Sequence, residues 1–307
     1  MSIDVLQEKI RKTKNPSMVG LDPSPETVPP HLIQAAIAKN GHTLEALAEA
    51  YETFCAQLLR AFKGIIPAVK VQSACFDALG APGVAAMQRV LQQAQKLGYY
   101  VVLDSMRGDV GVIAALCAQS LFGQVQAGEE TFQPYACDGV TLNGYLGGDS
   151  IAPFLPYCEK GKKNLFILVK TSNRTSTEVQ DLLSGGRLVH TAMADLVNRW
   201  GAGMHGKCGY CQVAAVVGAT YPNILKTLRS KYPGMFFLVP GYGAQGGTAK
   251  GVAGAFDRFG HGAVVSASRS IIAAWKKTET DGRDYVEQAI AAAEKMKKDL
   301  AKYTTVM

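Results

Sequence analysis

The sequence lacks any long hydrophobic segment. None of its apolar runs approaches the length of about 18 residues that a membrane-spanning helix needs. The first residues, Met1-Ser2-Ile3-Asp4-Val5, include an early acid, and no apolar core of a signal peptide follows them. Apolar residues still make up 48% of the chain, which is enough to build a substantial core. We therefore expect a soluble protein of the cytoplasm, with no membrane partner.

A disulfide framework is also lacking. The seven cysteines are odd in number and are scattered between Cys55 and Cys211. Cys208 and Cys211, with His205 just before them, have the spacing of half a zinc site, but no second Cys or His pair lies at ligand spacing. We therefore expect two thiols in a loop before a strand, and no metal.

Concentrated charge is scarce as well. The net charge is +7, but the basic residues are dispersed except in the segments 160–163 and 295–302. Neither segment is interleaved with aromatic residues, as nucleic-acid-binding segments often are. We expect no nucleic-acid partner, and the mild positive charge suits an anionic small-molecule substrate.

Short β-rich runs alternate with helical segments along the whole chain. This alternation favours one (β/α)8 barrel domain over residues 1–307, an α/β TIM barrel with an N-terminal helical segment and a C-terminal helix. A doubly wound sheet is the alternative, but no Gly-x-Gly-x-x-Gly motif follows the first strand. The expected strands are 18–21, 65–71, 99–103, 139–142, 165–170, 213–217, 236–239 and 263–266, and the clearest helical segments are 44–62, 84–97, 188–200 and 224–232.

Polar residues gather at the carboxyl ends of these expected strands. In a barrel these ends form one face, where active sites are built. Several such residues together predict a site; they are Asp22, Lys70, Asp104, Asn143, Thr171, Ser172, Thr220 and the segments 241–247 and 268–269.

The last two expected strands are followed by a predicted phosphate site. Glycines at 241, 243, 246 and 247 let backbone N–H groups approach an anion, and Arg269, just before an expected helix, adds a forked donor. The loops after strands 7 and 8 are the common phosphate position in such barrels. The alternative is a flexible turn with a surface arginine.

Two charged residues on neighbouring strands are expected to pair. Lys70 ends an apolar strand, and lysine is rarely buried without a partner, which Asp104 on the next strand provides. The alternatives are a lysine extending to the rim of the barrel and, for Asp22, a carboxylate that caps the turn before Pro23.

The segment Leu103-Asp104-Ser105-Met106-Arg107-Gly108-Asp109 resembles the Asp-x-Lys-x-x-Asp signature of the orotidine 5′-phosphate decarboxylase family. The resemblance to the longer bacterial type of this family covers nearly the whole chain in order and spacing. It includes Gly-Leu-Asp-Pro at 20–23, Ala-Val-Lys at 68–70, Thr-Leu-Asn at 141–143, Thr-Ser-Asn at 171–173, Val-Val-Gly-Ala-Thr at 216–220 and Val-Pro-Gly-x-Gly-Ala-Gln-Gly-Gly at 239–247.

The resemblance implies an activity and roles for individual residues. The family converts orotidine monophosphate to UMP and CO₂ in pyrimidine biosynthesis, without metal or organic cofactor, at sites shared across a homodimer. By resemblance, Lys70 and Asp104 form the charged network beside the ribose and the carboxylate that leaves, and Asp109 reaches into the partner's site. The substrate-binding residues implied are Asp22 for a ribose hydroxyl, Ser172 for the pyrimidine, and Gln245, Gly246, Ser268 and Arg269 around the phosphate.

This chain departs from the family pattern at the proton donor. Met106 stands where the family has its lysine, and a thioether has neither charge nor proton to give. Val112 and Ile113 replace the usual Ser-Thr, and Gly144 replaces a usual proline. Arg107 is a poor substitute, because strand alternation points it away and its pKa makes it a weak acid. With the lysine removed, a raised pKa on one of the neighbouring carboxylates Asp104 and Asp109 is a hypothesis for a slow proton source.

Three interpretations remain open from the sequence. The chain is a decarboxylase with impaired turnover, a homologue that binds UMP-like nucleotides without turnover, or a related barrel enzyme acting on another sugar phosphate. The phosphate features, Ser172 and Gln245 favour the first two.

Overall fold

A closed barrel of parallel strands forms the centre of the molecule. The computed structural model describes residues 1–307, and its barrel strands follow one another around the ring in the order β1-β12-β11-β10-β7-β6-β3-β2. The bounds are β1 Ser17–Leu21, β2 Ala68–Gln72, β3 Tyr100–Arg107, β6 Gly139–Leu142, β7 Asn164–Lys170, β10 Val213–Val217, β11 Phe237–Pro240 and β12 Ala263–Ala267. The first and last strands pair in parallel, from Ser17 beside Val265 to Val19 beside Ala267. The predicted TIM barrel is confirmed, and the open doubly wound sheet is wrong because the ring closes.

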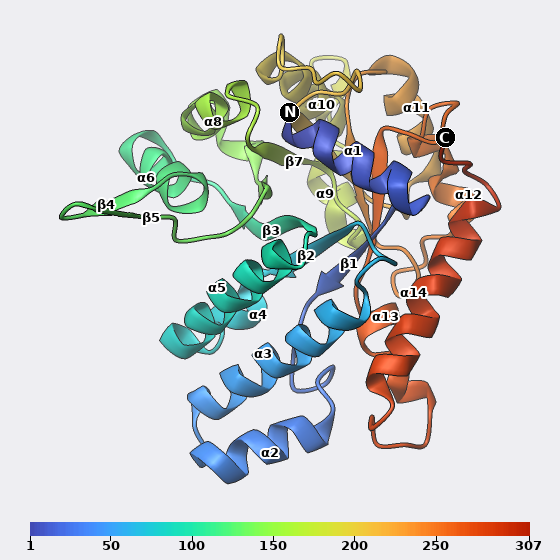
Figure 1. Ribbon diagram of the computed structural model, residues 1–307. Coiled ribbons are helices and arrows are strands. Elements are labelled where there is room, and N and C mark those ends of the chain that lie inside the picture. The colour runs from blue at the N-terminus through green and yellow to red at the C-terminus, as the bar shows by residue number, and fades with distance from the viewer.

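Helices surround the barrel (Figure 1). The longer ones are α1 Ser2–Thr13, α2 Pro30–Asn40, α3 Leu44–Ala61, α5 Gly80–Lys96, α6 Gly111–Phe122, α10 Val189–Trp200, α11 Pro222–Lys231 and α14 Tyr285–Ala301. Single turns or little more form α4 Ser73–Asp77, α7 Gly148–Ile151, α8 Leu155–Glu159, α9 Thr177–Gln180, α12 Ala249–Val252 and α13 Arg269–Ile272. The Thr43 hydroxyl accepts a hydrogen bond from the Ala46 N–H and caps α3, while Pro30 and Pro222 begin α2 and α11.

Alternation along the strands separates two cores. Val19, Val69 and Val101 face outward into a large apolar core shared with the helices. Met18, Tyr100 and Phe166 face inward, where they pack with Ile3, Leu6 and Ile10 of α1 in a second core. Helix α1 therefore closes the amino end of the barrel, and the opposite end is left for polar side chains.

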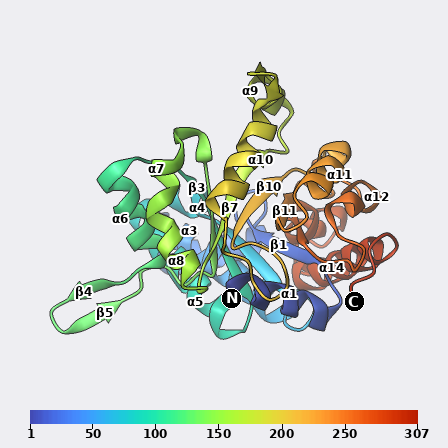
Figure 2. The ribbon, with the colours of Figure 1, turned by 90° about the horizontal axis from the view of Figure 1, so that it is seen from above.

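Two hairpins extend the molecule beyond the barrel and its helices. Strands β4, Val125–Ala127, and β5, Glu130–Phe132, form an exposed antiparallel arm that projects away from the barrel (Figure 2). Strands β8, Leu183–Ser184, and β9, Arg187–Leu188, form a shorter hairpin before α10. No helix of the chain combines the length and the apolar character that crossing a membrane requires.

Candidate active site

A cavity of about 320 Å³, which we call the strand-end cavity, opens at the carboxyl ends of the barrel strands. Eight of the predicted site residues line it, namely Asp22, Lys70, Asp104, Met106, Ser172, Gln245, Ser268 and Arg269. Asp109 and Gly246 do not line the cavity, and the roles expected for them, at the partner's site and at the phosphate, stay predictions. Gly246 instead occupies a tight turn with a φ of 92°, and its N–H donates to the Gly243 carbonyl.

A buried lysine lies between two carboxylates on one wall of the cavity. Lys70 Nζ is 2.7 Å from Asp104 Oδ2 and 3.3 Å from Asp22 Oδ1. The side chains of Lys70 and Asp104 are only 6% and 5% exposed, whereas Asp22 is 27% exposed. The pairing predicted between Lys70 and Asp104 is present, and Asp22 joins it rather than only capping a turn.

The carboxylates determine the protonation of Lys70. Burial alone lowers the pKa of a lysine, because it disfavours the charged form. Here the negative charges of Asp104 and Asp22 and their hydrogen bonds outweigh burial, so the pKa of Lys70 lies above its ordinary value. Lys70 is therefore a fixed positive charge at neutral pH and a reluctant proton donor.

Two uncharged side chains complete the surroundings of Asp104. Gln72 Nε2 donates to Asp104 Oδ2 at 3.0 Å, and the Thr141 hydroxyl donates to Oδ1 at 2.6 Å. Neither residue was predicted to belong to the site. Gln72 follows Lys70 by two positions in the same strand, the spacing that places both side chains on one face. Thr141 carried no such signal, because its role depends on how β6 pairs with β3.

Strand β3 bulges where it reaches the cavity. Leu103 pairs with Val140 and Arg107 with Leu142, so β3 advances four residues while β6 advances two. Within the bulge, Met106 has a φ of 47°, which is uncommon for a residue other than glycine. Its N–H donates to the Thr141 hydroxyl at 3.1 Å. Thr141 therefore holds both the carboxylate of Asp104 and the strained backbone that aims Met106 at the cavity.

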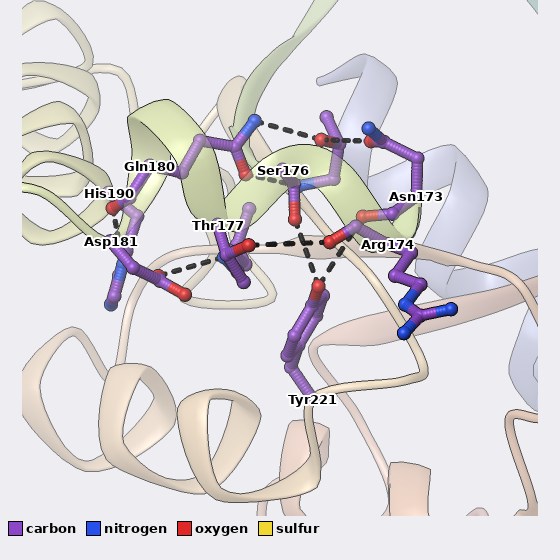
Figure 3. Close-up of polar contacts among 10 residues, drawn as sticks. Asn173, Arg174, Ser176, Thr177, Gln180, Asp181, His190 and Tyr221 are labelled. Atoms are coloured by element: carbon purple, nitrogen blue, oxygen red, sulfur yellow. Dashed lines mark hydrogen bonds and ion pairs between the residues drawn. The ribbon is translucent and has the colours of Figure 1, made fainter.

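A second buried lysine supports the wall that carries Ser172. Lys170 is fully buried at the end of β7, where its Nζ donates to Asp181 at 2.8 Å and lies 4.5 Å from the centre of the Tyr221 ring. Gln180 binds the backbone N–H and the hydroxyl of Thr171, and Ser176 bonds to the hydroxyl of Tyr221 (Figure 3). These contacts anchor both ends of the loop 171–181, so Ser172 projects from a fixed segment.

The opposite wall is built on glycine. Gly241 has a φ of 99°, and a Cβ there would lie 2.7 Å from Gln245 Oε1 and 3.0 Å from Ser172 Cβ, so no side chain is accommodated. Arg269 is exposed and has no carboxylate at ion-pair distance. Helix α13, which begins with Arg269, is a single turn, Arg269–Ile272. An anion here would therefore rely on Arg269 and the loop amides more than on the helix that the sequence led us to expect.

The segment after Met106 turns away from the cavity. Asp109 accepts a hydrogen bond from the Val110 N–H and precedes α6, whose outer face exposes Val112, Ile113 and Leu116. Val112 is 76% exposed, and Val110 is 47% exposed. Large apolar side chains are thus gathered on the surface beside a carboxylate that has no partner in its own site.

The cysteines form no ligand cluster. All seven are free, and no group of three or more His, Cys, Asp or Glu side chains is arranged to hold a metal ion. Cys208 and Cys211 are reduced thiols beside β10, and burial raises the pKa of both. The Cys211 thiol donates to the Gly201 carbonyl at 3.0 Å.

Comparison with known proteins places this geometry in one family. Residues 18–299 match the model of the orotidine 5′-phosphate decarboxylase / HUMPS family. The chain is 38% identical over 274 residues, 89% of either chain, to an orotidine 5′-phosphate decarboxylase of Rhodopirellula baltica. It is 36% identical to one from Clostridium perfringens over 94% of either chain.

A solved structure shows the same fold. The OMP decarboxylase of Leishmania donovani superposes with a TM-score of 0.74 at 27% identity and covers 98% of each chain. The family match spans the barrel from Met18 onward and every residue of the strand-end cavity. This chain belongs to the orotidine 5′-phosphate decarboxylase / HUMPS family.

Proposed function

We propose that the chain is a carboxy-lyase that converts orotidine 5′-monophosphate (OMP) to UMP and CO₂ with impaired turnover. The observation that carries this proposal is the ion-paired arrangement of Lys70, Asp104 and Asp22 opposite Arg269 and the segment 241–247, which we call the glycine loop. Fixed charges on one wall and anion donors on the other match a substrate that carries a phosphate at one end and a reacting carboxylate at the other. The relatives named as decarboxylases add the specific reaction.

The phosphate and the base occupy separate parts of the cavity in this proposal. Gln245, Ser268 and Arg269 hold the phosphate, Ser172 contacts the pyrimidine, and Asp22 accepts a ribose hydroxyl. Binding energy from the phosphate keeps the glycine loop closed over the substrate, remote from the bond that breaks.

The charged network acts on the carboxylate that leaves. Loss of CO₂ from C6 leaves an electron pair on a carbon with few resonance outlets, so the site must stabilise this developing charge more than the starting carboxylate. Lys70, fixed and positive, provides the nearby charge, and Asp104 holds it in place. The electron pair then takes a proton to give UMP.

Protonation is the step that Met106 impairs. Met106 lines the cavity beside Asp104 and has no proton to donate. Lys70 retains its proton because both of its carboxylate partners favour the charged form. Met106 is 46% exposed, so water reaches the mouth of the cavity and is the remaining proton source in this proposal.

The direct test follows the loss of OMP absorbance with the wild-type chain, Met106→Lys and Met106→Leu. A positioned general acid contributes roughly a hundredfold to ten-thousandfold, so we expect Met106→Lys to raise kcat by at least about a hundredfold. Met106→Leu, the matched apolar control, keeps the low rate. Rapid turnover by the wild-type chain with no gain in Met106→Lys would contradict the assignment of Met106.

Met106 also favours a second candidate, a nucleotide-binding homologue without turnover. A chain that binds UMP tightly, yet stays inactive in both the wild-type and Met106→Lys forms, is this homologue. A chain that ignores both OMP and UMP but binds another sugar phosphate is instead the third kind of barrel enzyme.

We further propose a homodimer with shared sites. The exposed apolar residues of α6 need a cover, and Asp109 beside them has no role in the cavity of its own chain. A second copy related by a two-fold axis would cover the apolar residues of α6 and would receive Asp109 in its own cavity. Sedimentation of Ile113→Glu tests this, because a charge on that face separates the copies, whereas the exposed control Glu178→Gln leaves them together.

A further inference from the structure

A larger cavity, about 640 Å³, lies on the other side of the glycine loop. Its walls are the loop itself, α12, α13, the turn 274–277 and α14. The helices α12, α13 and α14 lie together at one edge of the barrel (Figure 1). Tyr242 lines both this cavity and the strand-end cavity, and the two cavities share no other residue. The volume falls within the range of small-molecule sites.

The charges around this second cavity are strongly unbalanced. Four lysines line it, Lys250, Lys277, Lys295 and Lys302, against a single carboxylate, Asp299. Asp299 is already bound to Lys302 at 2.8 Å and accepts from the Tyr242 hydroxyl at 3.3 Å. Lys250, Lys277 and Lys295 have no carboxylate at ion-pair distance, so three positive charges meet around one cavity. Their mutual repulsion is relieved by an anion between them.

A buried hydroxyl in the same wall is unsatisfied. The Ser270 Oγ atom is buried and has no hydrogen-bond partner, and Ser270 lines the cavity. Buried polar atoms without partners are rare in folded proteins and cost stability. A ligand oxygen in the cavity would satisfy this hydroxyl.

The floor of the cavity is apolar. Ile271, Ala274, Ala292 and Met296 form it, and Tyr303 stands at the rim with 52% of its surface exposed. An inorganic anion would leave this floor in contact with water. A ligand with a flat or apolar body and a multiply charged end fills both parts.

We propose that this cavity is a second site, distinct from the strand-end cavity, which binds a nucleoside polyphosphate. The phosphates lie among Lys250, Lys277 and Lys295 and accept from Ser270, and the base rests on the apolar floor below Tyr303. This site does not depend on the decarboxylation proposed above.

The test is calorimetric titration of the full-length chain with ATP in the presence of EDTA, with and without saturating UMP. We expect one ATP per chain whether or not UMP is present, with an affinity that falls as salt rises. Pyrophosphate and adenosine, as separate halves of the ligand, each bind more weakly than ATP. Displacement of ATP by UMP would overturn the proposal, because ATP would then occupy the strand-end cavity.

Matched variants locate the site. Lys250→Gln/Lys295→Gln should weaken ATP binding by at least about tenfold, the effect of losing one or two charge-assisted hydrogen bonds. Lys226→Gln/Lys297→Gln removes the same charge from an exposed and a half-buried position, neither of which lines the cavity, and should leave the affinity unchanged. Arg269→Ala should also leave ATP binding intact, which separates the two cavities even if UMP fails to bind. Equal weakening in both lysine pairs, or no binding at 1 mM ATP, would overturn the site.

Discussion

The two walls of the strand-end cavity are built on opposite principles. On the wall of β1, β2 and β3, Lys70 and Asp104 are buried, and each has partners within hydrogen-bond distance. On the wall after β11 and β12, Arg269 is exposed and unpaired, and Gly241 adopts a conformation that favours glycine. We call the first the complete wall, because its charged groups have partners within the protein, and the second the open wall, because Arg269 has none. Charges that act on a reacting bond must be fixed in advance, whereas charges that hold a remote phosphate need not be.

The largest expected effect comes from breaking the complete wall. Lys70→Met leaves Asp104 buried without its cation, and removing one partner of a buried pair costs about 3–5 kcal/mol of unfolding free energy. Urea unfolding measures this loss, and OMP turnover should vanish in the same variant. Lys70→Met/Asp104→Leu removes both charges and should recover part of the stability but no activity. If Lys70→Met alone is as stable as the wild type, the ion pair is not required for the stability of the fold.

Breaking the open wall should leave the fold untouched. Arg269→Ala removes a forked, charge-assisted donor, and we expect UMP to bind about tenfold to a hundredfold more weakly. The urea midpoint should not change, because Arg269 has no partner in the free protein. The UMP affinity of Arg269→Lys should lie between those of the wild type and Arg269→Ala, since a lysine keeps the charge but not the forked pair of donors. Arg199→Ala, an exposed arginine on α10, is the control, and an equal loss of affinity there would argue against a phosphate role for Arg269.

A smaller effect sharpens the role of Thr141 in the complete wall. Thr141→Val keeps the shape but removes the hydroxyl that donates to Asp104 and accepts from the Met106 N–H, at a cost of about 1–2 kcal/mol. In a Met106→Lys background we expect kcat to fall while KM changes little, because position 106 is no longer aimed correctly. Thr141→Ser, which keeps the hydroxyl, should restore both the stability and kcat. If Thr141→Val lowers stability but leaves kcat unchanged, Thr141 only supports the fold.

The smallest effect concerns pH. The folded-state pKa of Lys70 is raised above its ordinary value of 10.5, so its stabilising contribution is fully present below that pH and declines as pH rises further. Burial also raises the pKa of tyrosines such as Tyr99, which add to alkaline unfolding. The informative quantity is therefore the difference in unfolding free energy between the wild type and Lys70→Met, measured as a function of pH. It should stay constant from about pH 6 to 9 and shrink only in stronger alkali; a change near neutrality would contradict the assignment.

Local patterns in the chain were enough to predict the strands of the barrel. Continuous apolar runs such as 213–217 are recognisable because a strand buried on both faces has no polar positions. The position of Lys70 at the end of such a run, next to Asp104 on the following strand, also predicted their pairing. The residues around them were harder to predict. Gln72 shares a face with Lys70, but the roles of Thr141, Lys170 and Tyr221 depend on contacts between distant segments.

The sequence by itself determined the order of strands and helices and the strand ends that carry polar side chains. It also determined that the side chain at position 106 has no ionisable proton to donate. These depend on periodicity and on the chemistry of single side chains. Only the tertiary structure decided that β3 bulges, that Thr141 joins Asp104 to the Met106 backbone, and that Asp109 lies outside its own cavity. It also decided that three lysines from separate segments surround the second cavity. The physical reason is that register and closure of the barrel set these distances, and both result from packing of the whole chain.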